Sequence, residues 1–219
     1  MVFLQEKRGE KEFDLRSTSR KFPRGKLLNE IRNSQRKVAF ANAKAMVISM
    51  KLIREKSCCF TGHRIIAGDE LPALRERLRE EIIRLAEQGI DTFLAGGALG
   101  FDTLAAQEVL SLRETELPEI HLVLVLPCLG QESRWDSESI ELYHDLIRQA
   151  DEVIYTGDIY TEGCMHTRNR YLVNHSSRCL CYLKDTAQGG TAYTVRYAKR
   201  QGLQITNLAG ESETYQLSF

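Results

Sequence analysis

Short apolar runs alternate with amphipathic stretches along most of this chain, and this alternation restricts the fold more than any other feature. Residues 121–126 (HLVLVL) are almost continuously β-branched or leucine, as expected for a strand covered on both faces. In residues 71–85, leucine and isoleucine recur at helical spacing between charged residues. Strands separated by helices of about 10–15 residues indicate βαβ units and a parallel sheet. We therefore predict an α/β, Rossmann-like fold of three layers, with helices on both faces of the sheet.

The same two periodicities place the other elements. The predicted strands share short apolar runs and cover residues 56–61, 92–95, 121–126, 153–155, 178–183 and 203–208. The predicted helices share apolar residues three or four positions apart and cover residues 71–85, 101–113, 140–147, 165–175 and 191–201. These elements define a Rossmann-like domain at residues 55–208, between an extension at 1–50 and a tail at 209–219.

The first fifty residues differ from the rest in charge. They hold 12 Lys and Arg against 5 Asp and Glu, and only residues 26–50 could give a loose amphipathic helix. A basic arm for nucleic acid or another acidic surface is one interpretation. A disordered tail is a second, and translation that begins at Met50 is a third. We expect a disordered or partly helical extension.

The main body carries an excess of negative charge. Residues 51–219 hold the remaining 18 basic residues against 25 acidic ones. This balance argues against a dedicated nucleic-acid surface, because such affinity depends on neutralising phosphates. The longest apolar run, residues 122–127, is far shorter than the ~18 residues of a membrane span. Since the N-terminus also lacks a secretory apolar segment, a cytoplasmic protein is expected.

Six cysteines are scattered through the domain, and they form neither a CxxC pair nor a zinc-like double pair. Most lie in or beside strand-like runs, so we interpret them as buried free thiols in a reducing cytoplasm. The sequence therefore predicts no metal site. It identifies no cofactor other than a possible bound nucleotide.

The ends of the predicted strands carry the candidate site, because ligands of parallel sheets bind at the carboxyl ends of the strands. The first strand ends in Gly62, His63 and Arg64. Glycine allows a tight turn and a close approach of backbone. Arginine offers donors suited to phosphate or carboxylate. The histidine could bind a ligand, act as acid or base, or cap the turn.

The second strand runs into Gly96, Gly97 and Gly100, followed by Asp102 in the first turn of a helix. Backbone N–H groups of such a loop can face an anion, and the helix dipole adds to the attraction. The alternative is that these glycines only permit tight packing. Asp102 could accept a ribose hydroxyl, or it could cap the helix and compensate its dipole.

The remaining strand ends add a tryptophan, an arginine pair and a second glycine turn. Trp135 follows the third strand and could stack on a base, pack on another subunit or cover the edge of the core. Arg168 and Asn169 follow the fourth strand. After the fifth strand, a helix opens on three residues that could face a phosphate: Gly189, Gly190 and Thr191.

Taken together, these motifs resemble the YpsA-like family of the SLOG superfamily of Rossmann-like domains. The resemblance rests on TGHR after the first strand, GGALGFDTLAAQ after the second, WD at 135–136, RN at 168–169 and GGTAYTVRYAK near the end. It implies a nucleotide-derived ligand on the loops around Gly62, Gly97 and Gly190. The superfamily also holds the Lonely Guy enzymes, whose PGGxGTxxE motif has a catalytic glutamate with no counterpart in residues 189–194.

We therefore expect a bacterial or phage protein that binds or senses a nucleotide derivative such as an ADP-ribose or NAD-like compound. The alternative is a hydrolase that cleaves an N-glycosidic or phosphate bond of such a ligand, with Asp102, Glu132 and His63 as candidate acids or bases. A DprA-like role in binding nucleic acid is the third option, and the acidic body argues against it. Relatives in this superfamily suggest a homodimer.

Overall fold

One parallel sheet of six strands organises the residues that the computed structural model describes, 52–184 and 188–209. The strands are β1 (Ser57–Gly62), β2 (Thr92–Ala95), β3 (His121–Leu126), β4 (Glu152–Tyr155), β5 (Arg178–Tyr182) and β6 (Gln204–Asn207). The predicted extension at 1–50 and residues 210–219 of the predicted tail lie outside the described residues.

A helix connects each strand to the next. These helices are α2 (Leu71–Glu87), α3 (Phe101–Thr115), α4 (Ser137–Gln149), α5 (Cys164–Asn174) and α6 (Gly190–Arg200), and a short 3-10 turn, η1 (Arg54–Lys56), precedes β1. The predicted α/β, Rossmann-like class is confirmed. Each predicted strand and helix corresponds to an observed one, with most ends displaced by one or two residues.

The order of the strands across the sheet creates a switch point in its middle. The order is β4-β3-β2-β1-β5-β6, and all neighbours are parallel. The chain moves outward from β1 to β4, then returns through α5 to place β5 on the other side of β1. Ligands of open parallel sheets bind at the carboxyl ends of the strands at such a point.

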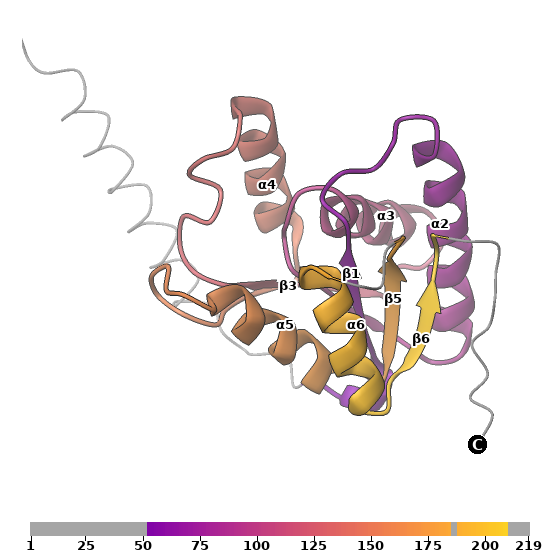
Figure 1. Ribbon diagram of the computed structural model, residues 1–219. Coiled ribbons are helices and arrows are strands. Elements are labelled where there is room, and N and C mark those ends of the chain that lie inside the picture. The colour runs from indigo at the N-terminus through magenta and orange to yellow at the C-terminus, as the bar shows by residue number, and fades with distance from the viewer. Residues whose placement is uncertain (1–51, 185–187, 210–219) are drawn as a thin grey trace, which may run out of the picture. The chain divides into compact units, whose positions relative to one another are not determined.

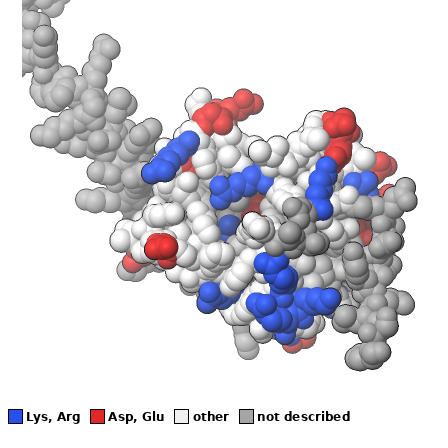
Figure 2. Space-filling model, in the orientation of Figure 1, with Lys and Arg blue, Asp and Glu red and all other residues white. Residues whose placement is uncertain are grey.

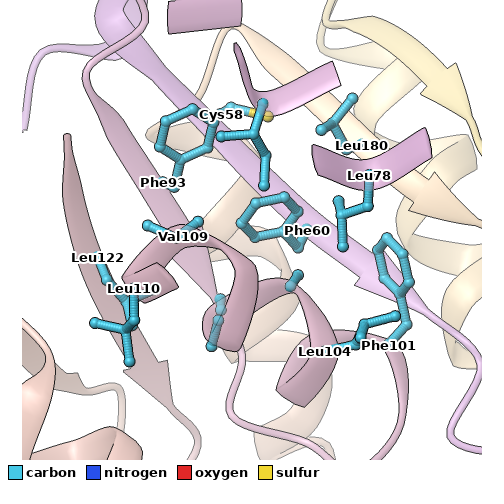
Figure 3. Close-up of a cluster of buried hydrophobic side chains, with 14 of the residues drawn as sticks. Cys58, Phe60, Leu78, Phe93, Phe101, Leu104, Val109, Leu110, Leu122 and Leu180 are labelled. Carbon is cyan, nitrogen blue, oxygen red and sulfur yellow. The ribbon is translucent and has the colours of Figure 1, made fainter. Parts of the chain in front are cut away.

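The helices form two layers, one on each face of the sheet. In Figure 1, α5 and α6 lie in front of the strands, and α2 and α3 lie behind them. The larger hydrophobic core joins α2, α3 and α4 to one face, and a smaller core joins α5 and α6 to the other. In the larger core, shown in Figure 3, the rings of Phe60 and Phe93 stack with centroids 5.9 Å apart. Phe60 also meets Phe101 edge-on at 6.4 Å.

All six cysteine side chains are buried, as the sequence predicted. Burial raises the pKa of the Cys58 thiol well above its ordinary value, which disfavours the reactive thiolate. Within residues 52–184 and 188–209, no cluster of His, Cys, Asp or Glu side chains could hold a metal ion. No helix in this part of the chain is long and apolar enough to cross a membrane.

Candidate functional site

A cavity of about 300 Å³ lies at the switch point, where the end of β1 meets the N-terminal turns of α3, α5 and α6. Of the thirteen residues predicted from the strand ends, eight line it: Gly62, His63, Arg64, Asp102, Arg168, Asn169, Gly190 and Thr191. The other five, Gly96, Gly97, Gly100, Trp135 and Gly189, are not among its lining residues.

The turn after β1 is held tightly against the start of α3. The N–H of Phe101 donates to the carbonyl oxygen of His63 at 3.1 Å. Gly100 has a φ of +80°, and a Cβ there would overlap with the backbone of Arg64. Glycine is therefore required where these two segments cross. The crossing leaves Arg64 exposed at the mouth of the cavity.

His63 is engaged in holding the turn rather than poised as a base. Its Nε2 accepts a hydrogen bond from the backbone N–H of Lys184 at 3.0 Å, which places the ring proton of a neutral imidazole on Nδ1. Its ring packs edge-on against Tyr182, with centroids 5.9 Å apart. This geometry favours the capping interpretation, since the lone pair of Nε2 is already in use.

Asp102 and Arg168 form a buried ion pair on the wall of the cavity. Asp102 is 7% exposed and Arg168 is 5% exposed. Their nearest charged atoms, Oδ2 and Nη1, are 3.5 Å apart. Burial raises the pKa of Asp102, and the charge of Arg168 opposes that shift. Burial likewise lowers the pKa of Arg168, and Asp102 opposes it. Each charge therefore depends on the other to remain inside the protein.

The glycine loop after β2 wraps around this arginine. Nη1 of Arg168 donates to the carbonyl oxygen of Gly96, and a Cβ on Gly96 would overlap with the guanidinium group. The carbonyl oxygen of Gly97 accepts from Nε2 of Gln131 at 2.9 Å, and Gly97 has a φ of +60°. These two glycines thus serve close packing, the alternative that the sequence had left open.

The second glycine turn opens α6, which contributes another part of the cavity lining. Gly189 caps the helix with a φ of +97°, and no atom of the described residues lies within 4 Å of the place where a Cβ on Gly190 would stand. The hydroxyl of Thr191 donates to the carbonyl oxygen of Gly62 at 2.8 Å. Nδ2 of Asn169 donates to the hydroxyl of Thr194 at 2.8 Å, which ties α5 to α6. The cavity thus faces the first turn of α6, whose N–H groups have no intrahelical acceptors.

Comparison with known sequences agrees with this architecture. A sequence model named YpsA, which represents the YspA SLOG family, matches residues 66–209. The chain belongs to this family. The match begins just after the Gly62–Arg64 turn and includes α3, α5 and α6, the helices that wall the cavity.

Proteins named UPF0398 are among the relatives of this SLOG chain. UPF0398 protein BH1768 of Halalkalibacterium halodurans is 33% identical over 133 residues, covering 60% of this chain and 70% of the relative. UPF0398 protein ABC2016 of Shouchella clausii is 29% identical over 128 residues, covering 58% and 68%. Among solved structures, DNA processing protein A from Helicobacter pylori superposes with a TM-score of 0.52 at 19% identity, covering 72% of this chain and 67% of that one. At that identity the likeness concerns the fold alone.

Two further residues named from the sequence lie away from the cavity lining of this SLOG domain. Trp135 packs edge-on against Tyr143 at 5.3 Å and contacts the larger core, so it covers the core edge. Oε1 of Glu132 lies 3.8 Å from Nε2 of His144, and no described residue provides a hydrogen-bond partner for its buried Oε2. Neither side chain reaches the cavity in this arrangement.

Sequence reasoning also missed five lining residues: Phe60, Thr61, Ala98, Met165 and Leu172. Two of them could have been found. Met165, Arg168, Asn169 and Leu172 follow the spacing i, i+3, i+4, i+7, which places them on one face of α5. Arg168 and Asn169 were already candidates, so the rest of that helical face was the signal to follow.

Proposed function

We propose that the cavity binds a nucleotide or a nucleotide derivative, such as an ADP-ribose or NAD-like compound, through its phosphate groups. Arg168 carries this proposal. It is a buried cation on the cavity wall, and no described residue provides a hydrogen-bond partner for its Nε. A buried charge is stable only when it is fully paired and hydrogen-bonded.

The pairing of Arg168 within the protein is incomplete. Its nearest carboxylate oxygen is 3.5 Å away, and the positive charge of Arg64 also acts on it and helps to lower its pKa. An anionic group in the cavity would offset both the burial and this repulsion. Phosphate fits such a site well, because arginine donors and phosphate oxygens have matching geometry.

The start of α6 adds a second source of attraction for an anion. The first turn of α6 contributes Gly190 and Thr191 to the lining, and the positive end of a helix dipole favours phosphate. A volume of about 300 Å³ is at the small end of ligand sites, which span roughly 300–1,000 Å³. The cavity would therefore hold the phosphate and sugar, with the base extending past Arg64 at the mouth.

Replacing Gly190 with aspartate should abolish ligand binding without unfolding the protein. Among residues 52–184 and 188–209, nothing lies within 4 Å of the position that the new Cβ would take. A carboxylate in the first turn of α6 interacts favourably with the helix dipole, by about 0.3–1 kcal/mol, while it repels phosphate. Without ligand, we expect the melting temperature of the variant to equal that of the wild type or to be slightly higher. The thermal shift given to the wild type by ADP-ribose, NAD, AMP or ATP should be lost.

Gly190→Ala is the matched control, because it adds the same Cβ without the charge. It should keep the ligand-induced thermal shift. For the wild type, that shift corresponds to an increase of about 2.7 kcal/mol in the free energy of unfolding at a ligand concentration of one hundred times Kd. A Gly190→Asp protein that keeps the full shift would contradict the placement of phosphate at α6. A wild type that no compound stabilises at millimolar concentration would contradict the whole proposal.

Hydrolysis of the bound nucleotide is the second candidate, and Asp102 is the observation that favours it. It lines the cavity, and burial raises its pKa, as is common for carboxyl groups that act as acids or bases. Incubating each nucleotide with high protein concentration, followed by mass spectrometry, should then release a sugar phosphate or free base. Asp102→Asn should abolish this release while the thermal shift remains. Unchanged nucleotides would leave binding as the function.

A further inference from the structure

Charge is divided between the two helical layers of this protein. Helices α5 and α6 contain five cationic residues, Arg168, Arg170, Arg196, Lys199 and Arg200, and no Asp or Glu. Helices α2, α3 and α4 together contain ten acidic residues and six arginines, so their balance is negative whereas that of α5 and α6 is positive. Figure 2, seen from the side of α5 and α6, shows Lys and Arg gathering over the lower end of α6. The negative net charge of residues 51–219 therefore does not extend to the layer formed by α5 and α6.

Three aromatic rings lie among these cations: His166 is exposed, Tyr193 and Tyr197 are half-buried, and Tyr197 also packs against the smaller core. His166 of α5 and Tyr193 of α6 are in contact, with ring centroids 4.4 Å apart. Tyr193 and Tyr197 are one helical turn apart, and their rings are parallel within 2° at 6.4 Å. We define the α5–α6 face as these three rings together with Arg170, Asn174 and Arg200.

Polar contacts fix the orientation of the rings. Nε of Arg170 donates to the hydroxyl of Tyr193 at 3.0 Å. The hydroxyl of Tyr197 donates to Oδ1 of Asn174 at 3.0 Å, and the guanidinium of Arg200 lies 5.8 Å from the centre of the Tyr197 ring. The rings are thus ordered before any partner arrives, which lowers the entropy lost on binding.

We infer that the α5–α6 face binds single-stranded nucleic acid. Proteins that hold single strands combine cations along the backbone with aromatic side chains on which bases stack. This face offers both, since Arg170 and Arg200 flank the parallel rings of Tyr193 and Tyr197. An acidic peptide would use the cations but not the rings, so nucleic acid matches more of the surface. The inference is independent of the proposed ligand cavity, which opens at the carboxyl edge of the sheet.

Fluorescence anisotropy with a labelled oligo(dT) strand and the full chain tests this inference. Reversing two charges, in the variant Arg170→Glu/Arg200→Glu, should weaken binding about tenfold or more. It should also reduce the slope of log K against log salt by about 0.7 for each lost phosphate contact. The matched control is Arg84→Glu/Arg148→Glu, which makes the same charge change on exposed residues of α2 and α4. The control should bind like the wild type.

A second pair of variants separates base stacking from charge. Tyr197→Ala should weaken binding roughly 5- to 100-fold, the usual effect of removing a stacking ring, whereas Tyr197→Phe should keep most of the affinity. Thermal melting of both variants checks that the fold is intact. Tyr197 is not among the residues that line the cavity, so Tyr197→Ala should keep the nucleotide-induced thermal shift of the wild type. Failure of the cavity proposal is therefore distinguishable from failure of this one.

Three results would overturn the inference. The first is equal affinity of Arg170→Glu/Arg200→Glu and its matched control, which would also be seen if residues 1–50 alone held the strand. The second is competition by poly-glutamate as effective as by unlabelled oligo(dT) at equal charge, which would indicate a partner read by charge only. The third is unchanged affinity of folded Tyr197→Ala.

Discussion

Arg168→Leu should lower the free energy of unfolding by about 3–5 kcal/mol, the usual result of removing one partner from a buried ion pair. Asp102 would then be a carboxylate at 7% exposure without its cation. The carbonyl oxygen of Gly96 would also lose its donor. Urea denaturation of the variant and the wild type measures the difference.

The loss from Arg168→Leu should depend on pH. Burial already holds the pKa of Asp102 above its ordinary value of 3.8 in the folded protein, and removing the cation raises it further. A carboxyl whose folded pKa is raised favours folding less as pH rises, because the folded state binds the proton more tightly. The variant's deficit should therefore be largest above the folded pKa and shrink as pH falls towards 3.8. A deficit independent of pH would mean that lost packing, rather than the orphaned charge, explains it.

The double variant Arg168→Leu/Asp102→Asn provides the control. It removes both charges, so it should be more stable at neutral pH than Arg168→Leu alone. The difference from additivity gives the coupling between the two side chains. Additive losses would contradict a direct interaction between them.

Gly100→Ala should be strongly destabilising, because backbone strain and a steric overlap coincide at this position. The φ of +80° and ψ of −122° cost an alanine about 1–3 kcal/mol in backbone strain. The new Cβ would overlap with the carbonyl group of Arg64, which is backbone and cannot rotate away. Overpacking of this kind adds about 1–3 kcal/mol. Thermal or urea denaturation should show a loss of stability equal to the sum of the backbone strain and the overpacking.

Gly163→Ala separates these two effects. Gly163 has the same φ of +80°, with a ψ of −1°, and no atom in the described part of the chain lies within 4 Å of its Cβ position. It should cost only the left-handed backbone penalty of about 1–2 kcal/mol. If Gly163→Ala and Gly100→Ala prove equally destabilising, the crossing of the two segments at Gly100 is not tight.

The fold could be predicted from the sequence because its pattern is local. The run at 121–126 and the leucine spacing of 71–85 determine their own strand and helix, so element boundaries agree closely. The position of β5 beside β1 is different. Pairing between Cys59 and Cys179 joins strands 120 residues apart, and no local pattern specifies which edge a returning strand will choose.

The candidate site shows the same contrast between what a local pattern predicts and what depends on distant segments. Residues at strand ends, such as Arg64 and Thr191, reach the cavity because topology alone brings those ends together. Gly96 looked the same in sequence, yet a side chain fills the space beside it. A glycine signals that something approaches the backbone closely, but it does not tell whether that neighbour is a ligand or, as here, the guanidinium of Arg168.

The hydrogen bond from Arg168 to Gly96 also has a consequence for biosynthesis. It joins the glycine loop of the first half of the sheet to a helix made 72 residues later. Until α5 and β5 leave the ribosome, the β5-facing edge of β1 has no partner strand, and such an edge invites pairing with other chains. A nascent or truncated product that stops before Cys164 thus lacks both the brace and the cavity. The cavity is complete only once α6 has been made, because Gly190 and Thr191 of α6 form part of its lining.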